Sequence, residues 1–183
     1  MVDNPIAAIV IGAMCGFLLV FWTIPSARQR RPHMVFVSFA LIAFLTLAVL
    51  TIASVWQPTS HTWLRVVGWI VQLLGVVLLT NSFHYLSTRG RPLDKGEPTS
   101  VVDTGVYRLT RHPMYAGMGI WAVGMALCRP NMGSSLIAGA CVVFTLLAAV
   151  KEDDYNLKRF GESYAEYMRR VPLLNLFQKR ARS

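Results

Sequence analysis

Charged residues are scarce in this sequence, and acidic residues are the scarcest. Asp and Glu number 9 against 18 Lys and Arg, and charged residues make up only 15% of the 183 residues. Hydrophobic residues make up 54%, above the ~45–50% that is typical of a soluble domain. The composition therefore favours a small integral membrane protein over a soluble domain.

Cysteine is also rare. Cys15, Cys128 and Cys141 lie in apolar stretches, without paired spacing and without His or Asp neighbours in the sequence. We therefore predict buried thiols rather than disulfides or metal ligands, and no metal site is expected. The dinucleotide-binding pattern Gly-x-Gly-x-x-Gly does not occur either, which counts against a membrane reductase that uses a nicotinamide cofactor.

Long apolar runs are what the sequence does contain. Three of them have the ~20 residues that a membrane-spanning helix needs, and they cover residues 5–27, 33–55 and 63–86. Two shorter runs follow at 113–128 and 133–150, and the Pro and Gly residues between them indicate a tight turn. We therefore expect an all-α membrane protein with about five transmembrane helices, of which the last two form a helical hairpin.

The first apolar run is expected to stay on the protein as an anchor. Asp3 precedes it and its basic residues follow it, which is the reverse of a secretory signal peptide. Gly12 and Gly16 form a Gly-x-x-x-Gly pair, which permits close helix contact within the chain or in a dimer. We expect the contact to be within the chain, and the oligomeric state stays open.

Lys and Arg are distributed unevenly about these runs. Sixteen of the 18 follow the first, third or fifth run, and only Arg65 and Arg129 fall on the other side. The positive-inside rule then predicts an N-terminus outside and a large loop and C-terminus in the cytoplasm. The net charge of +9 is explained by this topology, so the lipid bilayer is the expected partner and nucleic acid is not.

The stretch 105–117 joins a polar loop to the fourth apolar run. Pro113 suits the first position of a helix, because its missing N–H would be unpaired there in any case. The remaining N–H groups of that turn would form an anion site, flanked by Arg111 and His112. With Tyr115 on the same turn, this stretch is a candidate binding mouth.

A second polar group, the run at 151–154, follows the fifth apolar run and contains three acids. We expect the helix to end there, and because the partial negative charge of a helix end disfavours acids, a positive group should compensate them. Two alternatives stay open at this point. One is a cationic ligand, and the other is the set of basic neighbours Lys151, Lys158 and Arg159.

Two further segments are candidates for covering the mouth. The loop at 87–104 is rich in Gly, Pro, Ser and Thr, and so long a loop in a compact protein is expected to be functional. Near the C-terminus, apolar residues recur at helical spacing opposite a charged face, which predicts a helix lying on the membrane surface. These residues are Phe160, Tyr164, Tyr167, Met168 and Val171.

The order of these motifs is informative. Gly-x-Tyr-x-x-x-Arg-His-Pro-x-Tyr-x-Gly opens a predicted hairpin, a pair of acids follows it, and Phe-Gly-x-x-Tyr-x-x-Tyr comes last. Over roughly residues 65–175 this resembles the integral-membrane methyltransferases, which include isoprenylcysteine carboxyl methyltransferase and the phospholipid N-methyltransferases. We accordingly divide the chain into an N-terminal two-span scaffold, 1–60, and a methyltransferase core, 61–183.

The resemblance implies S-adenosylmethionine in a cytoplasm-facing pocket and a lipophilic acceptor, of isoprenoid or phospholipid type, that enters from the bilayer. Carried over to this sequence, it predicts a cofactor site made of Val101, Val102, Tyr107, Arg111, His112, Pro113, Met114, Tyr115 and Glu152. Glu152 would meet the methionine ammonium, and His112 with the helix N–H groups would meet the carboxylate.

Two departures from the isoprenylcysteine enzymes concern the acceptor. Ala148 stands where they carry an arginine, and Thr99 stands where they carry a histidine. We therefore expect an acceptor that is not held through a carboxylate, with an amine head group as one possibility. An amine must lose a proton before transfer, and Glu152 and Asp153 are the nearest candidate bases. The alternatives are a nicotinamide-dependent membrane reductase and a non-enzymatic membrane protein.

Overall fold

The computed structural model describes residues 5–29, 31–90 and 100–173, and within these ranges the chain is helical without strands. An α-helix, a π-helical turn and a short α-helix run on without a break as α1 (Pro5–Leu18), η1 (Leu19–Thr23) and α2 (Ile24–Arg28). The other elements are α3 (Pro32–Ile52), α4 (Thr62–Arg89), the 3-10 turn η2 (Gly105–Arg108), α5 (Pro113–Cys128), α6 (Met132–Phe160) and α7 (Glu162–Arg170).

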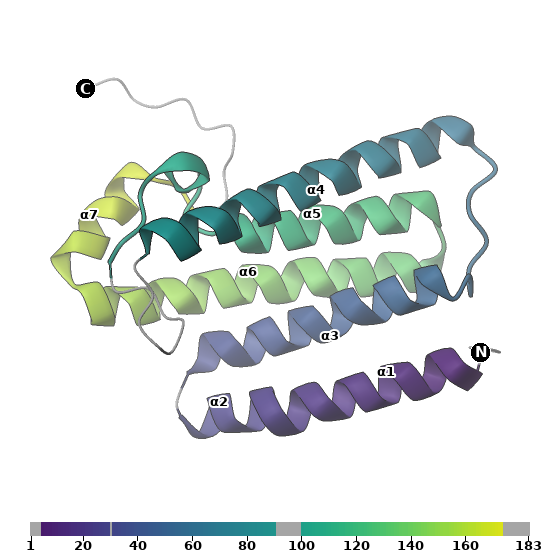
Figure 1. Ribbon diagram of the computed structural model, residues 1–183, viewed down its shortest axis with the longest axis horizontal. Helices are drawn as coiled ribbons and strands as arrows, with labels where there is room; N and C mark the ends of the chain where they lie inside the picture. The colour runs from purple at the N-terminus through teal and green to yellow at the C-terminus, as the bar shows by residue number, and fades with distance from the viewer. Residues whose placement is uncertain (1–4, 30, 91–99, 174–183) are drawn as a thin grey trace.

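The long helices lie side by side, and α7 and η2 cover one end of them (Figure 1). In the part of the chain that the structure describes, four helical segments are long and apolar enough to cross a bilayer: Pro5–Arg28, Pro32–Ile52, Thr62–Arg89 and Met132–Phe160. The fifth, α5, has 16 residues and is about 24 Å long, against about 30 Å for the hydrocarbon core of a bilayer. The expected all-α membrane fold is confirmed, with four full-length candidate spans and one short apolar helix.

One expected boundary is wrong. The helix of the fifth apolar run was expected to end with that run at residue 150, but α6 continues to Phe160. The acids of residues 151–154 therefore lie inside a helix, and the unfavourable helix end does not exist there. The sequence holds no Gly or Pro between 150 and Gly161, and Gly161 ends the helix at a positive φ of 57° that suits glycine.

The α4–α5 contact fixes the position of the candidate site. A Cβ atom added at Gly75 would lie 2.6 Å from the Trp121 nitrogen, and one added at Gly124 would lie 2.7 Å from the Gln72 nitrogen. The two backbones therefore touch, as small residues allow in membrane helices. Because α5 begins at Pro113, this contact also sets the place of the residues just before it.

The expectation for Gly12 and Gly16 within the chain is wrong. A Cβ atom added at either glycine would meet nothing within 4 Å. The helix α1 instead buries Ala7, and η1 buries Thr23. The cysteine expectation holds for Cys128 and Cys141, which are buried and free, while Cys15 is half-buried.

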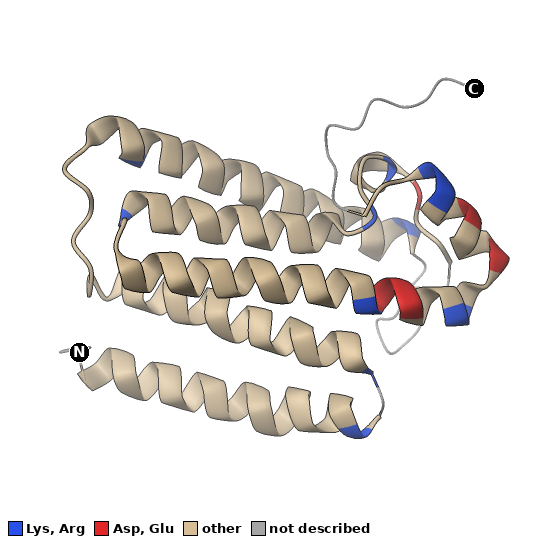
Figure 2. Cartoon of the chain, turned by 180° about the vertical axis from the view of Figure 1, so that it is seen from behind, with Lys and Arg blue, Asp and Glu red and all other residues tan. Residues whose placement is uncertain are grey.

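Charged residues gather at the end of the bundle that carries α7 (Figure 2). Among the described residues, Arg65 near the start of α4 and Arg129 after α5 are the basic exceptions. The Arg129 Nε donates to the Trp56 carbonyl at 2.9 Å. Part of the loop 87–104, with Thr99, and the last ten residues lie outside the described ranges.

Candidate functional site

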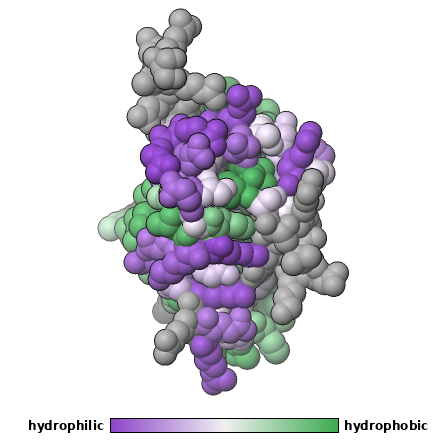
Figure 3. All heavy atoms as spheres, turned by 90° about the vertical axis from the view of Figure 1, so that its left-hand side faces the viewer, coloured by the Kyte–Doolittle hydropathy of each residue, from purple (hydrophilic) through white to green (hydrophobic). Residues whose placement is uncertain are grey.

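A cavity of about 520 Å³ opens at the charged end of the bundle, within the ~300–1,000 Å³ usual for ligand pockets. Viewed toward that end, apolar side chains lie among hydrophilic ones (Figure 3). Eight of the nine predicted cofactor residues line this cavity: Val101, Val102, Tyr107, Arg111, His112, Met114, Tyr115 and Glu152. Pro113 is buried at the first position of α5 and is not among the lining residues.

One face of α6 forms a wall of the cavity. Its lining residues are Glu152, Tyr155, Asn156, Arg159 and Phe160. Their spacing of i, i+3, i+4, i+7 and i+8 places them on a single helix face. The extension of α6 past residue 150 therefore supplies this wall.

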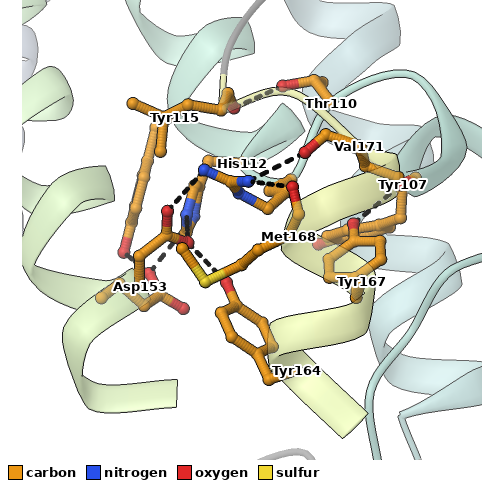
Figure 4. A network of polar contacts seen from close by, with 12 residues as sticks. Tyr107, Thr110, His112, Tyr115, Asp153, Tyr164, Tyr167, Met168 and Val171 are labelled. Carbon is orange, nitrogen blue, oxygen red and sulfur yellow. Dashed lines mark hydrogen bonds and ion pairs between the residues drawn. The ribbon is translucent and has the colours of Figure 1, made fainter. Parts of the chain in front are cut away.

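Asp153 lies on a different face of α6 and holds three donors (Figure 4). The Nη2 of Arg111 donates to Oδ2 at 2.8 Å, and the Tyr164 hydroxyl donates to Oδ1 at 2.6 Å. The Nε2 of His112 lies 2.8 Å from Oδ1. A carboxylate only accepts, so that ring nitrogen carries the proton. Asp153, one of the two candidate bases, is thus buried in a structural network and is not among the lining residues of the cavity.

Arg111 connects this network to the C-terminal segment. Its Nη1 donates to the carbonyls of Met168 and Val171, each at 2.9 Å, and its backbone N–H donates to the Pro172 carbonyl. Most of the guanidinium is thus used within the protein. Its Nε is buried without a hydrogen-bond partner among the described residues.

Glu152 is the more exposed of the two adjacent acids. Its side chain is 30% exposed against 8% for Asp153. The Tyr115 hydroxyl donates a hydrogen bond to Glu152, and the His112 Nδ1 lies 3.8 Å from it. Among the described residues that line the cavity, Glu152 is the only acid, so it is the group that can receive a cation there.

Three tyrosines form an aromatic cover over the cavity. The Tyr167 hydroxyl donates to the Tyr107 carbonyl at 2.7 Å, and Tyr164 holds Asp153. Burial raises the pKa of all three phenols well above the usual value, so they remain protonated donors. The predicted C-terminal helix is present as α7, but its apolar face packs against the protein, since Tyr164 and Tyr167 are buried and line the cavity.

The positive groups that compensate the acids are only partly those named in the sequence analysis. Asp153 is paired by Arg111 and His112 from the segment before α5. Lys151 lies 3.7 Å from Asp154, so one of the proposed basic neighbours does pair, but with the exposed acid. The two polar motifs are thus joined directly to each other.

Sequence reasoning missed the part of the cavity that comes from the first two spans. The lining residues there are Trp22, His33, Met34, Val37 and Leu41, and no motif distinguishes them from lipid-facing residues. Tyr155 and Asn156 could have been found, because they follow Glu152 at three and four residues on a helix.

The Asp153 network predicts a difference between two neighbouring acids. Asp153→Asn removes the charge facing Arg111 and His112 and should lower the free energy of unfolding by about 3–5 kcal/mol. It should also expose α7 to limited proteolysis in detergent. The control is Asp154→Asn, since this side chain is 62% exposed and such pairs contribute about 0–1 kcal/mol. Equal thermal unfolding of the two variants would contradict the assigned role of Asp153.

Comparison with known proteins confirms the resemblance drawn from the motifs. Residues 63–163 match the phospholipid methyltransferase family. The chain is 35% identical over 123 residues to protein-S-isoprenylcysteine O-methyltransferase B of Arabidopsis thaliana, covering 62% of this chain and 59% of that protein. It is 30% identical over 156 residues to the probable protein-S-isoprenylcysteine O-methyltransferase of Oryza sativa subsp. japonica, covering 81% and 78%.

The human protein-S-isoprenylcysteine O-methyltransferase is 31% identical over 118 residues, which is 61% of this chain and 40% of that protein. The chain spans about half the length of several relatives that it matches. No solved structure matches it significantly. Because the family match covers more than half of its residues, the chain belongs to the phospholipid methyltransferase family.

Proposed function

We propose that this protein is a membrane methyltransferase that uses S-adenosylmethionine to methylate a lipophilic acceptor. The observation that carries the proposal is a single cavity with two chemically different parts. One part holds Glu152 among tyrosines, and the other is lined by apolar side chains of the membrane helices. A water-soluble cationic donor and a membrane-resident acceptor need these two environments side by side.

The residues present fit the donor. S-adenosylmethionine supplies a methyl group on a positively charged sulfur and also carries an ammonium group. Glu152 is the acid available for a charge-assisted hydrogen bond, and the rings of Tyr107 and Tyr115 offer faces that attract cations. Val101 and Val102 provide an apolar surface for the adenine, as the family resemblance implies.

The cavity favours a carboxylate acceptor over the amine that Ala148 alone suggested. Ala148 is fully buried and does not line the cavity. The residue at this position therefore does not contact an acceptor bound in the cavity. Arg159 and Asn156 line the cavity and provide N–H donors for an anion. The relatives are named protein-S-isoprenylcysteine O-methyltransferases, which also supports a prenylated cysteine carboxylate as the acceptor.

A carboxylate acceptor makes modest demands on the protein. Its oxygen forms the new bond to the methyl carbon, the electron pair of the broken carbon–sulfur bond stays on sulfur, and no proton moves. The chain would contribute alignment and a cavity poor in water. Neither Glu152 nor Asp153 is then required as a base.

For localisation, we propose that the cavity, α7 and the C-terminus face the cytoplasm and that the N-terminus lies outside. The support is the concentration of Lys and Arg at the end of the bundle that holds the cavity. Reporter domains fused to the C-terminus should therefore be active only in the cytoplasm. A C-terminal reporter that is active only outside would contradict this orientation.

The donor assignment predicts a specific effect of Glu152→Gln. The change keeps the size of the side chain and removes its charge. Affinity for S-adenosylhomocysteine, measured by calorimetry in detergent, should fall about tenfold to a hundredfold, since such a bond contributes about 1.5–3 kcal/mol. The matched control, Glu162→Gln, changes an exposed acid of α7 paired with Arg169 and should bind normally. If the wild-type protein binds reduced nicotinamide adenine dinucleotide phosphate and not S-adenosylhomocysteine, the reductase alternative is favoured.

The acceptor assignment predicts the product of a labelled-methyl assay. With N-acetyl-S-farnesylcysteine, label should appear in a base-labile ester, and the same compound with its carboxylate converted to an amide should take up none. Phosphatidylethanolamine tests the amine alternative. Label found in this lipid and not in the farnesylcysteine would overturn the carboxylate proposal but leave the methyltransferase assignment intact.

A further inference from the structure

One wall of the cavity lies outside the segment that matches the family. The match begins at residue 63, whereas Trp22, His33, Met34, Val37 and Leu41 come from the first two spans. This N-terminal wall is apolar except for His33, and among its described residues His33 is the only one that can ionise. The residues 1–60, interpreted from sequence as scaffold, therefore contribute to the cavity itself.

The residues of the N-terminal wall on α3 run along the helix from the charged end of the bundle toward its middle. His33, Val37 and Leu41 follow one another at i, i+4 and i+8, so they share a face of α3. Eight residues of helix span about 12 Å, from the charged end of the bundle toward its apolar middle. Leu79 of α4 and Met118 of α5 continue the apolar lining. A long apolar chain could lie along this face with its polar end at His33.

His33 is held at the polar end of this wall. It is 3% exposed, and its ring centroid lies 4.6 Å from that of Tyr155 on α6. Tyr155 follows Glu152 by three residues on the cavity face of α6, so both belong to the same stripe. His33 thus lies at the junction between the apolar N-terminal wall and the face of α6 that carries Glu152.

The π-helical turn η1 supplies the remaining residue of this wall. The hydroxyl of Thr23 donates to the Leu18 carbonyl, five residues earlier, at 3.1 Å. A π-helical insertion rotates the residues around it relative to a regular α-helix, and such insertions occur frequently at functional sites. Here the insertion contains Trp22, whose side chain lines the cavity.

We propose that the N-terminal wall is the acceptor subsite and that His33 determines specificity by hydrogen bonding to the polar head group of the acceptor. Met34, Val37 and Leu41 hold the apolar chain, and the ring of Tyr155 orients His33. This inference rests on the proposed function for the chemical class of the acceptor. It assigns the selection of the acceptor to the part of the chain outside the family match.

The test measures acceptor binding separately from turnover. N-acetyl-S-farnesylcysteine is titrated by calorimetry into detergent-purified protein saturated with S-adenosylhomocysteine. His33→Phe keeps an aromatic ring against Tyr155 and removes both ring nitrogens, so the acceptor affinity should fall about tenfold or more. The affinity for S-adenosylhomocysteine should stay within about twofold. His33→Gln restores a hydrogen-bonding group and should recover part of the loss.

The matched control is His61→Phe. His61 is exposed at the start of α4, at the opposite end of the bundle, and both affinities should stay unchanged. Unchanged acceptor binding in His33→Phe, an equal loss of both ligands, or no acceptor binding by wild type would each overturn the inference. A wild type that binds the acceptor but transfers no methyl group would refute the proposed function alone, and the effect of His33→Phe on binding would still support the subsite.

Discussion

The carboxylate of Asp153 on α6 joins this helix to the segment before α5 and to α7. It receives hydrogen bonds from Arg111 and His112 before α5 and from Tyr164 on α7. A charge this deeply buried is stable only when it is paired and its lone pairs are satisfied. Arg111 in turn donates to the carbonyls of Met168 and Val171 at the end of α7, so the aromatic cover of the cavity and its α6 wall are held together through this single carboxylate.

This arrangement separates the roles of two adjacent acids. Neighbouring residues on a helix point about 100° apart, so Asp153 can face α5 and α7 while Glu152 faces the cavity. The His112 ring lies near both acids, with Nε2 at Asp153 and Nδ1 at 3.8 Å from Glu152. Because Asp153 takes the strong donors, Glu152 keeps a partly exposed carboxylate beside a single tyrosine hydroxyl. A cationic ligand can therefore compete for Glu152 but not for Asp153.

Much of the site could be predicted from sequence because its residues follow local rules. Pro113 marks the start of a helix, and Tyr115 must then lie on its first turn. The helical spacing of apolar residues near the C-terminus places Tyr164 on the inner face of α7. The partner of Asp153 could not be predicted, since the pairing depends on a contact between segments about 40 residues apart. The length of α6 could not be predicted from hydropathy, because the apolar run ends at residue 150 whereas the helix continues to Phe160 and is ended by Gly161. The N-terminal wall could not be predicted, because Val37 and Leu41 lie in a uniformly apolar run and nothing in the sequence distinguishes them from lipid-facing residues.

The unequal lengths of α5 and α6 explain why the cavity lies at the charged end of the bundle. The 16 residues of α5 extend about 24 Å, and the 29 residues of α6 extend about 43 Å. The longer helix therefore continues past the start of its partner and presents its cavity face, from Glu152 to Phe160, above the apolar part of the bundle. Glu152 is then placed at the charged end of the cavity, while α3 provides an apolar surface toward the middle of the bundle. A shorter α6 would remove the polar half of the cavity and leave the apolar half intact.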